Sequence, residues 1–556
     1  MRRLLFLLVL GYAAAQEPDG DKTARWLKAL LPKAPAGEQN RALRQLGKAR
    51  DKRFIAPLID LLPFANTRQD FVAILETLGK LTGEKFAPEG NPWENCMVWY
   101  GAHSEWQPPP GYTAWKGELF GQRIDPRFRQ FLYQGATATV RVEEVAWGGV
   151  RVDGIPALVN PRMIAAAQAG YLTDREPVFG VSLEGHHRAY PLRILDWHEM
   201  ANDVVGGKPV ALAYCTLCGA GILYHAQAGG MTFQFGSSGL LFRSNKLMYD
   251  RTTNTLWNHL TGEPVIGKLA GNPIKLAVLP LVLTSWSQWR RRHPDTRVLD
   301  VNTGHMRRYE VGATYGAYFA SPHLMFPVWR QSRALPNKAR IFALQIEGVA
   351  KAYPLDELNR AGGVVNDTLG GRSLVVVYGD AVGKVSLPPT WREALKKLGG
   401  PHAGIELAND LSLAAALAAL NGQPRLSAEM TAEVLLAMPA EARLTLLNTR
   451  TSYDKTGSPP PPGWFSPNLR DEVGQRGLIG ETRAYQRGRH RFRGGAAAEV
   501  LIDENERPWR VTEEALLALD GERLARLPGH LAYWFGWFSF FPRTQVYSSQ
   551  NAAHSP

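Results

Sequence analysis

Two cysteines, Cys215 and Cys218, stand three positions apart in the sequence YCTLCG. A Cys-x-x-Cys pair either closes a reactive small-ring disulfide or holds one metal ion through two thiolates. A bridge between them closes so short a loop that it stabilises the fold by only about 2 kcal/mol, so a purely structural role explains the pair poorly. Gly219 and a short apolar strand follow the motif, which disfavours a thioredoxin-type site, where a helix N-terminus lowers the thiol pKa.

The chemistry of this pair depends on the acid, base or ligand that lies near it. Because no helix is expected to start at the motif, activation of a thiol requires a nearby cation such as His198, His225 or an arginine. His198 and Glu199 stand on a helix predicted over Arg193 to Asn202, directly before the strand that carries the cysteines. On that helix His198 shares a face with Asn202. We expect His198 and Glu199 to face the sulfurs and to control their protonation.

A metal site is the alternative chemistry. Cys215 and Cys218 supply two soft ligands, and His198 or His225 is the candidate for a further ligand of a zinc or copper ion. The sequence HEMAN at His198 begins like the His-Glu-x-x-His zinc motif but ends in asparagine, which excludes a metalloprotease. A third hypothesis is a non-catalytic module that binds an envelope ligand in an aromatic groove, with the cysteines only clipping a turn.

The chain contains two related segments, and only the first carries the cysteines. Residues 178–214 and 341–378 share identical residues at matching positions. These are Glu184-Gly185, Tyr190-Pro191-Leu192, Asn202-Asp203, Gly206-Gly207 and Tyr214 in the first segment, and Glu347-Gly348, Tyr353-Pro354-Leu355, Asn366-Asp367, Gly370-Gly371 and Tyr378 in the second. The second segment continues with Gly379-Asp380 and has no His-Glu pair. We therefore predict one working site and one supporting segment.

The similarity continues downstream of both segments. Trp286-x-x-Trp289 is matched by Trp534-x-x-Trp537, and Tyr249-x-Arg251 resembles Tyr485-x-Arg487. Each segment begins with apolar residues on both sides of a Glu-Gly turn, which predicts a β-hairpin. The sequence thus predicts an α+β fold in which two tandem, mixed β-rich repeats pack around a pseudo-two-fold axis.

Composition divides the chain into domains. Apolar residues recur at helical spacing as far as Leu81, so residues 16–90 are predicted to form a small HEAT-like helical unit. Residues 91–177 are predicted to form a connector rich in tryptophan and proline with entry strands. The first repeat then spans 178–340 and the second 341–556, with an insert at about 387–480 that contains Ala/Leu-rich helices and a proline-rich linker.

The first residues predict export. Positions 1–15 combine arginines, a short apolar run and Ala13-x-Ala15, which is the pattern of a secretory signal peptide. No later run reaches the ~20 apolar residues of a membrane span, so we expect a mature chain without a transmembrane helix in the periplasm or elsewhere in the envelope. The formal net charge is +13, but its basic runs lack an interleaved pattern of base-stacking aromatic residues, so no nucleic-acid partner is expected. The expected partner is a redox protein or an envelope component.

An ordered series of motifs resembles a known family. WHEMAND, YCTLCG, GSSGLLFRSNKLMYDRTTNTLW, SWSQWRRRHPDTRVL and LPGHLAYWFGWFSFFPRTQVY are similar to domain of unknown function family 3179, over about Asp153 to Tyr547 without the insert. The resemblance implies an exported or envelope protein of bacteria or archaea, and it supplies no established activity. Some members carry selenocysteine within the motif, which implies redox chemistry at Cys215 and Cys218. The leading hypothesis is therefore a thiol/disulfide redox protein.

Overall fold

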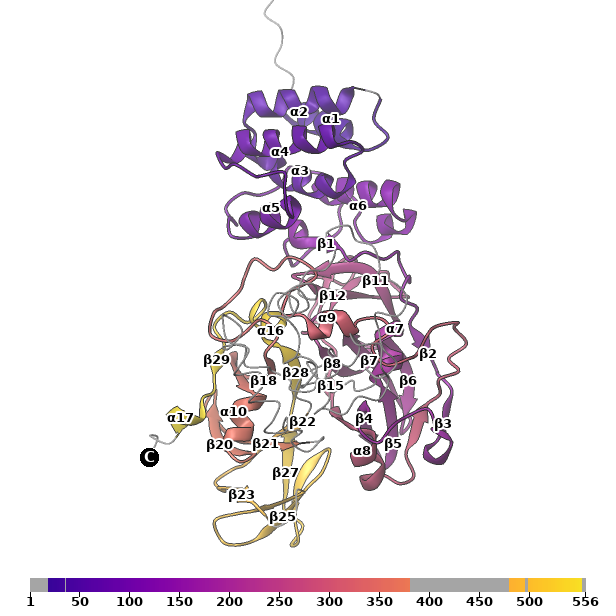
Figure 1. Ribbon diagram of the computed structural model, residues 1–556, viewed down its shortest axis with the longest axis vertical. Coiled ribbons are helices and arrows are strands. Elements are labelled where there is room, and N and C mark those ends of the chain that lie inside the picture. The colour runs from indigo at the N-terminus through magenta and orange to yellow at the C-terminus, as the bar shows by residue number, and fades with distance from the viewer. Residues whose placement is uncertain (1–18, 36, 381–479, 496–498, 553–556) are drawn as a thin grey trace, which may run out of the picture. The chain divides into compact units, whose positions relative to one another are not determined.

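A computed structural model describes residues 19–35, 37–380, 480–495 and 499–552 of the chain. The predicted signal peptide at 1–15, and the predicted insert apart from its last residue, lie outside the described residues. The chain divides into two compact units, residues 1–136 and 137–556. Each unit is built from its own elements, labelled in Figure 1.

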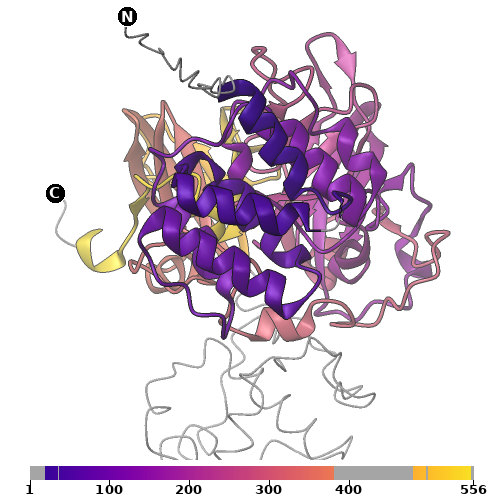
Figure 2. The ribbon, with the colours of Figure 1, turned by 90° about the horizontal axis from the view of Figure 1, so that it is seen from above.

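The first unit is made of short helices. In chain order they are α1 (Asp19–Leu30), α2 (Glu38–Ala49), η1 (Lys52–Phe54), α3 (Ile55–Leu61), η2 (Leu62–Phe64), α4 (Arg68–Thr82), α5 (Pro92–Gly101), α6 (Tyr112–Arg123) and η3 (Pro126–Gln130). Seen from above, the α-helices of this indigo and violet unit lie side by side (Figure 2). Their relation to HEAT repeats stays a prediction.

Helix α4 shows why these segments fold as predicted. The Thr67 hydroxyl accepts a hydrogen bond from the Asp70 N–H and caps its first turn, while Gly83, with a φ of 84°, ends it. Between these signals Ile74 and Leu78 recur on one face and are fully buried. Helical structure also continues past the predicted limit at residue 90, because α5 and α6 belong to the first unit.

The second unit consists mainly of antiparallel sheets. A first sheet has the order β1-β11-β12-β13-β14 (Val145–Trp147, Phe235–Phe242, Asn245–Asp250, Leu256–Asn258, Pro264–Ile266). A second has the order β15-β8-β7-β6-β2 (Val278–Leu279, Ala220–His225, Lys208–Cys215, Met200–Val205, Leu158–Val159). A third has the order β16-β4-β5-β17-β3 (Val282–Ser285, Pro177–Leu183, His186–Pro191, Arg297–Leu299, Met163–Ala165). A small pair joins β10 (Met231–Thr232) to β9 (Gln227–Ala228).

Two further sheets come from the later part of this unit. One has the order β28-β18-β19-β29 (Gly529–Tyr533, Arg340–Ile346, Val349–Pro354, Gln545–Val546). The other has the order β20-β21-β22-β27-β26-β25-β24-β23 (Val364–Leu369, Arg372–Asp380, Gly480–Gln486, Arg523–Leu527, Ala515–Ala518, Pro508–Val511, Val500–Ile502, Arg493–Gly494). Short helices connect the strands of the unit: η4 (Val142–Glu144), η5 (Ala166–Gln168), α7 (Leu192–His198), α8 (Trp286–Arg292), α9 (Gly316–Ala320), α10 (Leu355–Arg360), α16 (Trp534–Phe538) and α17 (Ser549–Ala552). The unit is α+β in composition.

The two segments of similar sequence form the same elements in the same order. The series β4-β5-α7-β6-β7-β8 in the first segment corresponds to β18-β19-α10-β20-β21-β22 in the second. Matching residues also make matching contacts: Tyr190 donates to Asp203 at 2.6 Å, and Tyr353 donates to Asp367 at 2.7 Å. The pseudo-two-fold axis between the segments stays a prediction.

The segments also contact each other. Strand β28 of the second repeat lies beside β8 of the first repeat, and β16 of the first lies beside β22 of the second. One apolar cluster contains Phe179 and Leu212 from the first segment together with Phe342 and Val376 from the second. The strand that follows the cysteines is therefore packed against the second segment. Among the residues that the structure describes, no helix has both the length and the apolar character needed to cross a bilayer.

The sequence expectation for the helix before the cysteines is partly wrong. Helix α7 ends at His198, because Glu199 adopts a left-handed conformation with a φ of 51°. Met200 to Val205 then pair with β7 as strand β6. Asn202 consequently does not share a helical face with His198. Its side chain instead bonds the backbone N–H and carbonyl of Phe235, at 2.8 and 2.9 Å.

Candidate functional site

Cys215 and Cys218 lie at the tip of one β-hairpin. Cys215 is the last residue of β7 and pairs with Ala220, the first residue of β8. A hydrogen bond of 3.3 Å from the Gly219 N–H to the Thr216 carbonyl closes the turn between these strands. Gly219 has a φ of 58°, a conformation that glycine adopts without steric cost. The ladder and the turn thus hold both cysteines at one site.

The two thiols are hydrogen-bonded to each other, and their pKa values move in opposite directions. Burial raises the pKa of Cys218 well above its usual value, and the hydrogen bond to Cys215 raises it further. Burial also raises the pKa of Cys215, but hydrogen bonds from the Cys218 thiol and from the backbone N–H groups of Lys246 and Cys218 lower it below its usual value. Cys215 is therefore the sulfur that ionises first, while Cys218 keeps its proton.

The pair is closed to solvent. Cys215 is 1% exposed and Cys218 is 0% exposed. Three consecutive carbonyl oxygens of the turn accept hydrogen bonds from groups that are distant in sequence. The Leu217 carbonyl accepts from the Tyr318 hydroxyl at 2.6 Å. The Cys218 carbonyl accepts from the Tyr533 N–H at 2.7 Å. The Gly219 carbonyl accepts from the Arg340 guanidinium at 3.1 Å.

Glu199 lies beside the cysteines, as the sequence predicted. Its Oε1 accepts a hydrogen bond of 2.8 Å from the hydroxyl of Thr216, the residue that follows Cys215. Its Oε2 lies 3.3 Å from the Nζ of Lys246, and both members of this ion pair are buried. The negative charge of Glu199 raises the pKa of both cysteines. A carboxylate connected to the turn through one hydroxyl group can take part in proton transfer.

His198 is held by contacts that do not involve the cysteines. Its Nδ1 bonds the carbonyl of Pro156 at 2.7 Å, and its Nε2 bonds the hydroxyl of Tyr309 at 2.5 Å. Burial lowers the pKa of His198 to about 4, so the ring is neutral at ordinary pH and supplies no positive charge to a thiolate. His198 thus contacts Pro156 and Tyr309, and its role in thiol protonation stays a prediction.

His225 lies at the far end of the strand that follows the cysteines. In the ladder it pairs with Val210, whereas Cys215 pairs with Ala220, five residues away. At about 3.3 Å per strand residue this separation is about 16 Å, too far for a shared metal ion. With both nitrogens of His198 engaged as well, neither predicted histidine is available as a ligand beside the sulfurs.

The group of three potential metal ligands found among the described residues lies elsewhere. It consists of His490, Asp503 and Glu504. Asp503 already accepts hydrogen bonds from the Trp509 indole, the Arg507 guanidinium and backbone N–H groups. It therefore has little capacity left for an ion, and this group contains neither cysteine.

Several residues at the site were not found by sequence reasoning. Lys246 supplies both a backbone hydrogen bond to Cys215 and the ion pair with Glu199. Tyr315 is hydrogen-bonded to Thr216, and Tyr318 binds the turn directly. None of them stands in a pattern that indicates chemistry. Lys246 does fall inside one of the motifs that resemble the family, which was the available signal.

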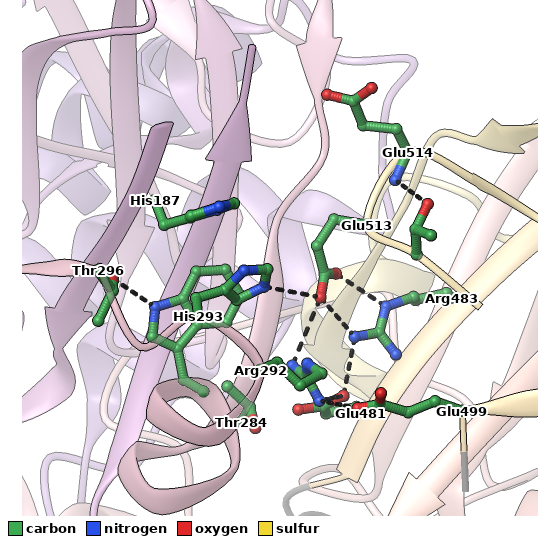
Figure 3. A network of polar contacts seen from close by, with 12 residues as sticks. His187, Thr284, Arg292, His293, Thr296, Glu481, Arg483, Glu499, Glu513 and Glu514 are labelled. Atoms are coloured by element: carbon green, nitrogen blue, oxygen red, sulfur yellow. Dashed lines mark hydrogen bonds and ion pairs between the residues drawn. The ribbon is translucent and has the colours of Figure 1, made fainter. Parts of the chain in front are cut away.

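In the second repeat a charged residue lies opposite the position that matches Cys215. Gly379 pairs with Glu481 in β21 and β22, as Cys215 pairs with Ala220 in β7 and β8. Glu481 accepts from Arg292 of α8 at 2.6 Å and from Arg483 at 2.8 Å (Figure 3). Figure 3 also shows Glu513 between Arg483 and His293. These buried charges neutralise one another, and the second hairpin presents no thiol among its described residues.

The third cysteine belongs to a different part of the chain. Cys96 lies in α5 of the first unit, and no disulfide joins it, Cys215 or Cys218 in the described structure. Burial raises the pKa of Cys96 to about 12. A thiol with so high a pKa is a poor nucleophile at ordinary pH, so Cys96 is chemically inert compared with Cys215.

Residues 152–393 match the model of a family described as Protein of unknown function (DUF3179). The chain carries a domain of this family. The matched range contains the cysteine hairpin, Glu199, Lys246, Tyr318 and strands β18 to β21, and it ends before the C-terminal motifs that also resemble the family. No curated protein and no solved structure matches the chain.

Proposed function

We propose that this chain is an exported thiol/disulfide redox protein whose dithiol consists of Cys215 and Cys218. The observation that carries the proposal is the hydrogen bond between the two thiols at one hairpin tip, with the pKa of Cys215 lowered and that of Cys218 raised. One sulfur is thereby prepared to attack and the other to remain protonated until it is needed.

The proposed roles follow from these pKa directions. The Cys215 thiolate attacks the oxidant, and Cys218 then attacks the Cys215 sulfur to close the disulfide. Closure releases the Cys218 proton, and the Thr216 hydroxyl with the Glu199 carboxylate offers a route for it. The complete oxidation transfers two electrons from the dithiol to the oxidant and leaves one bond between the two sulfurs.

Three competing interpretations explain the site less well. A disulfide here as a brace adds only about 2 kcal/mol to a turn that a strand ladder already closes. A zinc or copper ion needs ligands besides Cys215 and Cys218, and His198 and His225 are engaged or distant. The hypothesis of a non-catalytic envelope-binding module assigns no role to the split pKa values.

The proposed setting is the periplasm or envelope, since the sequence at 1–15 has the pattern of a signal peptide. An oxidising compartment allows a dithiol to cycle without being held reduced by cytosolic thiols. The proposed partner is another redox protein or an envelope component, with no role for nucleic acid.

The proposal is tested by mapping disulfides in the full-length protein after treatment with an oxidant and then with a dithiol reductant. Mass spectrometry is expected to show a Cys215–Cys218 bond that forms and is reversed, while Cys96 stays a thiol. A protein that keeps both thiols reduced under oxidation, although it is folded, contradicts the proposal. In that case, if Cys218→Ser leaves the binding of an envelope ligand unchanged, the hypothesis of a non-catalytic binding module is supported.

A further inference from the structure

The surroundings of the dithiol restrict what can reach it. The whole turn is buried, with Thr216 at 0% and Leu217 at 6% exposed. Attack on a disulfide requires access of the attacking thiolate to the substrate sulfur. A peptide or protein disulfide also brings its flanking backbone to the site. The carbonyl groups of the turn are already bound by Tyr318, Tyr533 and Arg340, so they are not available to dock such a backbone.

The last part of the first repeat forms a cover over the turn, which we define as residues 301–338. The hydroxyl of Tyr318, a residue of this cover, donates a hydrogen bond to the Leu217 carbonyl. Lys338 in turn holds Tyr318 in place. The Nζ of Lys338 donates to the carbonyls of Tyr318 and Ser321 at 2.5 and 2.7 Å and lies 3.3 Å from the centre of the Tyr318 ring. Burial lowers the pKa of Lys338 to about 7, so near neutral pH the amine is charged only about half of the time. Its hydrogen bonds to the two carbonyls hold Tyr318 in either protonation state.

The cover is fixed at other points as well. Tyr315 is hydrogen-bonded to Thr216 of the turn, and Tyr309 is bound by His198. Trp197 donates to the carbonyl of Arg308 at 2.7 Å. Opening a path for a polypeptide therefore requires several contacts to break together, and fewer of them need to break for a smaller oxidant.

We propose that the oxidant of this dithiol is a small hydroperoxide, of which hydrogen peroxide is the simplest, and not the disulfide of a protein or peptide. The inference rests on the proposed redox function and names the substrate class of the same site. Its basis is the closure of the turn by the cover and by the second segment.

The chemistry balances with the groups present. The Cys215 thiolate attacks one peroxide oxygen, the O–O bond breaks, and the leaving hydroxide or alkoxide takes up a proton to become water or an alcohol. Cys215 is then a sulfenic acid. The Cys218 sulfur attacks the Cys215 sulfur, the S–O bond breaks, and the departing oxygen leaves as water with the Cys218 proton. In sum, one dithiol and one hydroperoxide give one disulfide, one water and one alcohol or second water.

The test compares oxidants on the reduced full-length protein. The rate of Cys215–Cys218 bond formation is measured with hydrogen peroxide, with oxidised glutathione and with a disulfide-linked peptide. The expected second-order rate constant for peroxide exceeds that of either disulfide by about tenfold or more, because access and not thiolate reactivity limits the larger reagents.

Two substitutions in the cover test the physical reason. Tyr318→Ser removes the contact with Leu217, and Lys338→Met removes the amine that donates to the Tyr318 carbonyl. Each is expected to raise the rate with the two disulfides several-fold more than the rate with peroxide, so that the ratio of the peroxide rate to the disulfide rates falls. The matched control is Lys208→Met, which removes an exposed ion pair with Glu184 and is expected to change neither rate. Thermal unfolding of each variant verifies that it is folded.

The outcomes separate this inference from the proposed function. Oxidation by glutathione disulfide or the peptide as fast as by peroxide in the unaltered protein overturns the hydroperoxide proposal but retains the dithiol function. A cover substitution that accelerates all three oxidants equally also overturns it, since the cover then does not select by size. If no oxidant joins Cys215 to Cys218, the redox function itself fails.

Discussion

The backbone of Gly536 in α16 packs directly on the side chain of Cys218, although 318 positions separate them in the sequence. A methyl group added at Gly536 would lie 2.5 Å from the Cys218 Cβ. No real side chain tolerates so short a carbon–carbon distance, so glycine is required here. Gly536 comes from the second repeat. A repeat without cysteines thus contributes a packing contact to the site in the first repeat.

This close approach predicts the effect of Gly536→Ala. The added methyl group must displace Cys218 or α16, so we expect a loss of about 1–3 kcal/mol in the free energy of unfolding, together with a changed pKa of Cys215. Chemical denaturation measures the first effect and thiolate absorbance the second. Gly170→Ala is the control, because a methyl group there meets nothing within 4 Å. Equal stability of the two variants contradicts the contact.

The thiol–thiol hydrogen bond predicts the titration of a single-cysteine variant. Cys218→Ala removes the S–H donor that lowers the pKa of Cys215, so burial and the charge of Glu199 then raise that pKa. Thiolate absorbance followed against pH is expected to show the Cys215 transition at a higher pH than in the unaltered protein. Cys96→Ala serves as the control, since the transition of the dithiol should stay in place. A transition that moves to lower pH in Cys218→Ala excludes the bond.

Glu199→Gln is expected to raise the reduction potential of the dithiol and to lower the stability of the fold. Removing its negative charge lowers the pKa of Cys215, which stabilises the reduced form and raises the reduction potential. The change also removes the carboxylate that balances the charge of the buried Lys246 ammonium, which keeps only its hydrogen bond to the Glu199 carbonyl among these two contacts, at a cost of about 3–5 kcal/mol. Potential and denaturation midpoint are measured on the same preparation. Glu184→Gln, at an exposed ion pair with Lys208, should change neither. A lower potential in Glu199→Gln is inconsistent with the assigned electrostatics.

Buried neutral histidines predict the pH dependence of stability. Burial lowers the pKa of His198 to about 4 and that of His259 to about 3, below the ordinary value of 6.5. At a pH between the lowered pKa of each folded-state histidine and the ordinary value of 6.5, the unfolded chain binds more protons than the folded chain, so stability rises with pH. On acidification the protein therefore loses stability from about pH 6.5 down to about pH 4, by about 3 kcal/mol for His198. Urea midpoints measured across this range test the sign. His198→Gln should flatten the profile, and an unchanged slope refutes the assignment.

The general class of the fold could be predicted from local patterns. Helical spacing in the first unit and the Glu-Gly turns of the hairpins are short-range signals, and both gave the observed elements. The end of α7 could not be predicted in this way, because WHEMAND contains no helix-breaking residue. The pairing of β6 with β7 decides it, and such pairing depends on residues that are distant in sequence.

One predicted correspondence between the segments is wrong. The sequence suggested that Tyr485 matches Tyr249, but Tyr485 lies opposite Val375 in β22 as Tyr224 lies opposite Ala211 in β8. Both tyrosines also donate to backbone carbonyls, at 2.5 Å for Tyr485 and 2.6 Å for Tyr224. A shared Tyr-x-Arg spacing was too short a pattern to fix the strand register.

The site itself was predictable only where a motif carried it. The cysteines and Glu199 were identified from residue type and spacing. Lys246 contacts Cys215 and Glu199, and Tyr318 binds the Leu217 carbonyl. Lys246 stands in a motif that resembles the family, but its residue type and spacing did not indicate these contacts, and Tyr318 stands in no such motif. Their roles became visible only when the packing of distant segments was known.

The central claim is that Cys215 and Cys218 form a reversible redox couple, and an equilibrium redox titration with thiol trapping tests it most directly. Full-length protein is equilibrated in dithiol buffers of graded potential, the thiols are trapped, and the metal content of the same preparation is determined. The account predicts a two-electron transition of this pair above about −300 mV, with zinc and copper far below one equivalent. A pair that shows no transition in this range, or one that binds a stoichiometric metal ion, contradicts it.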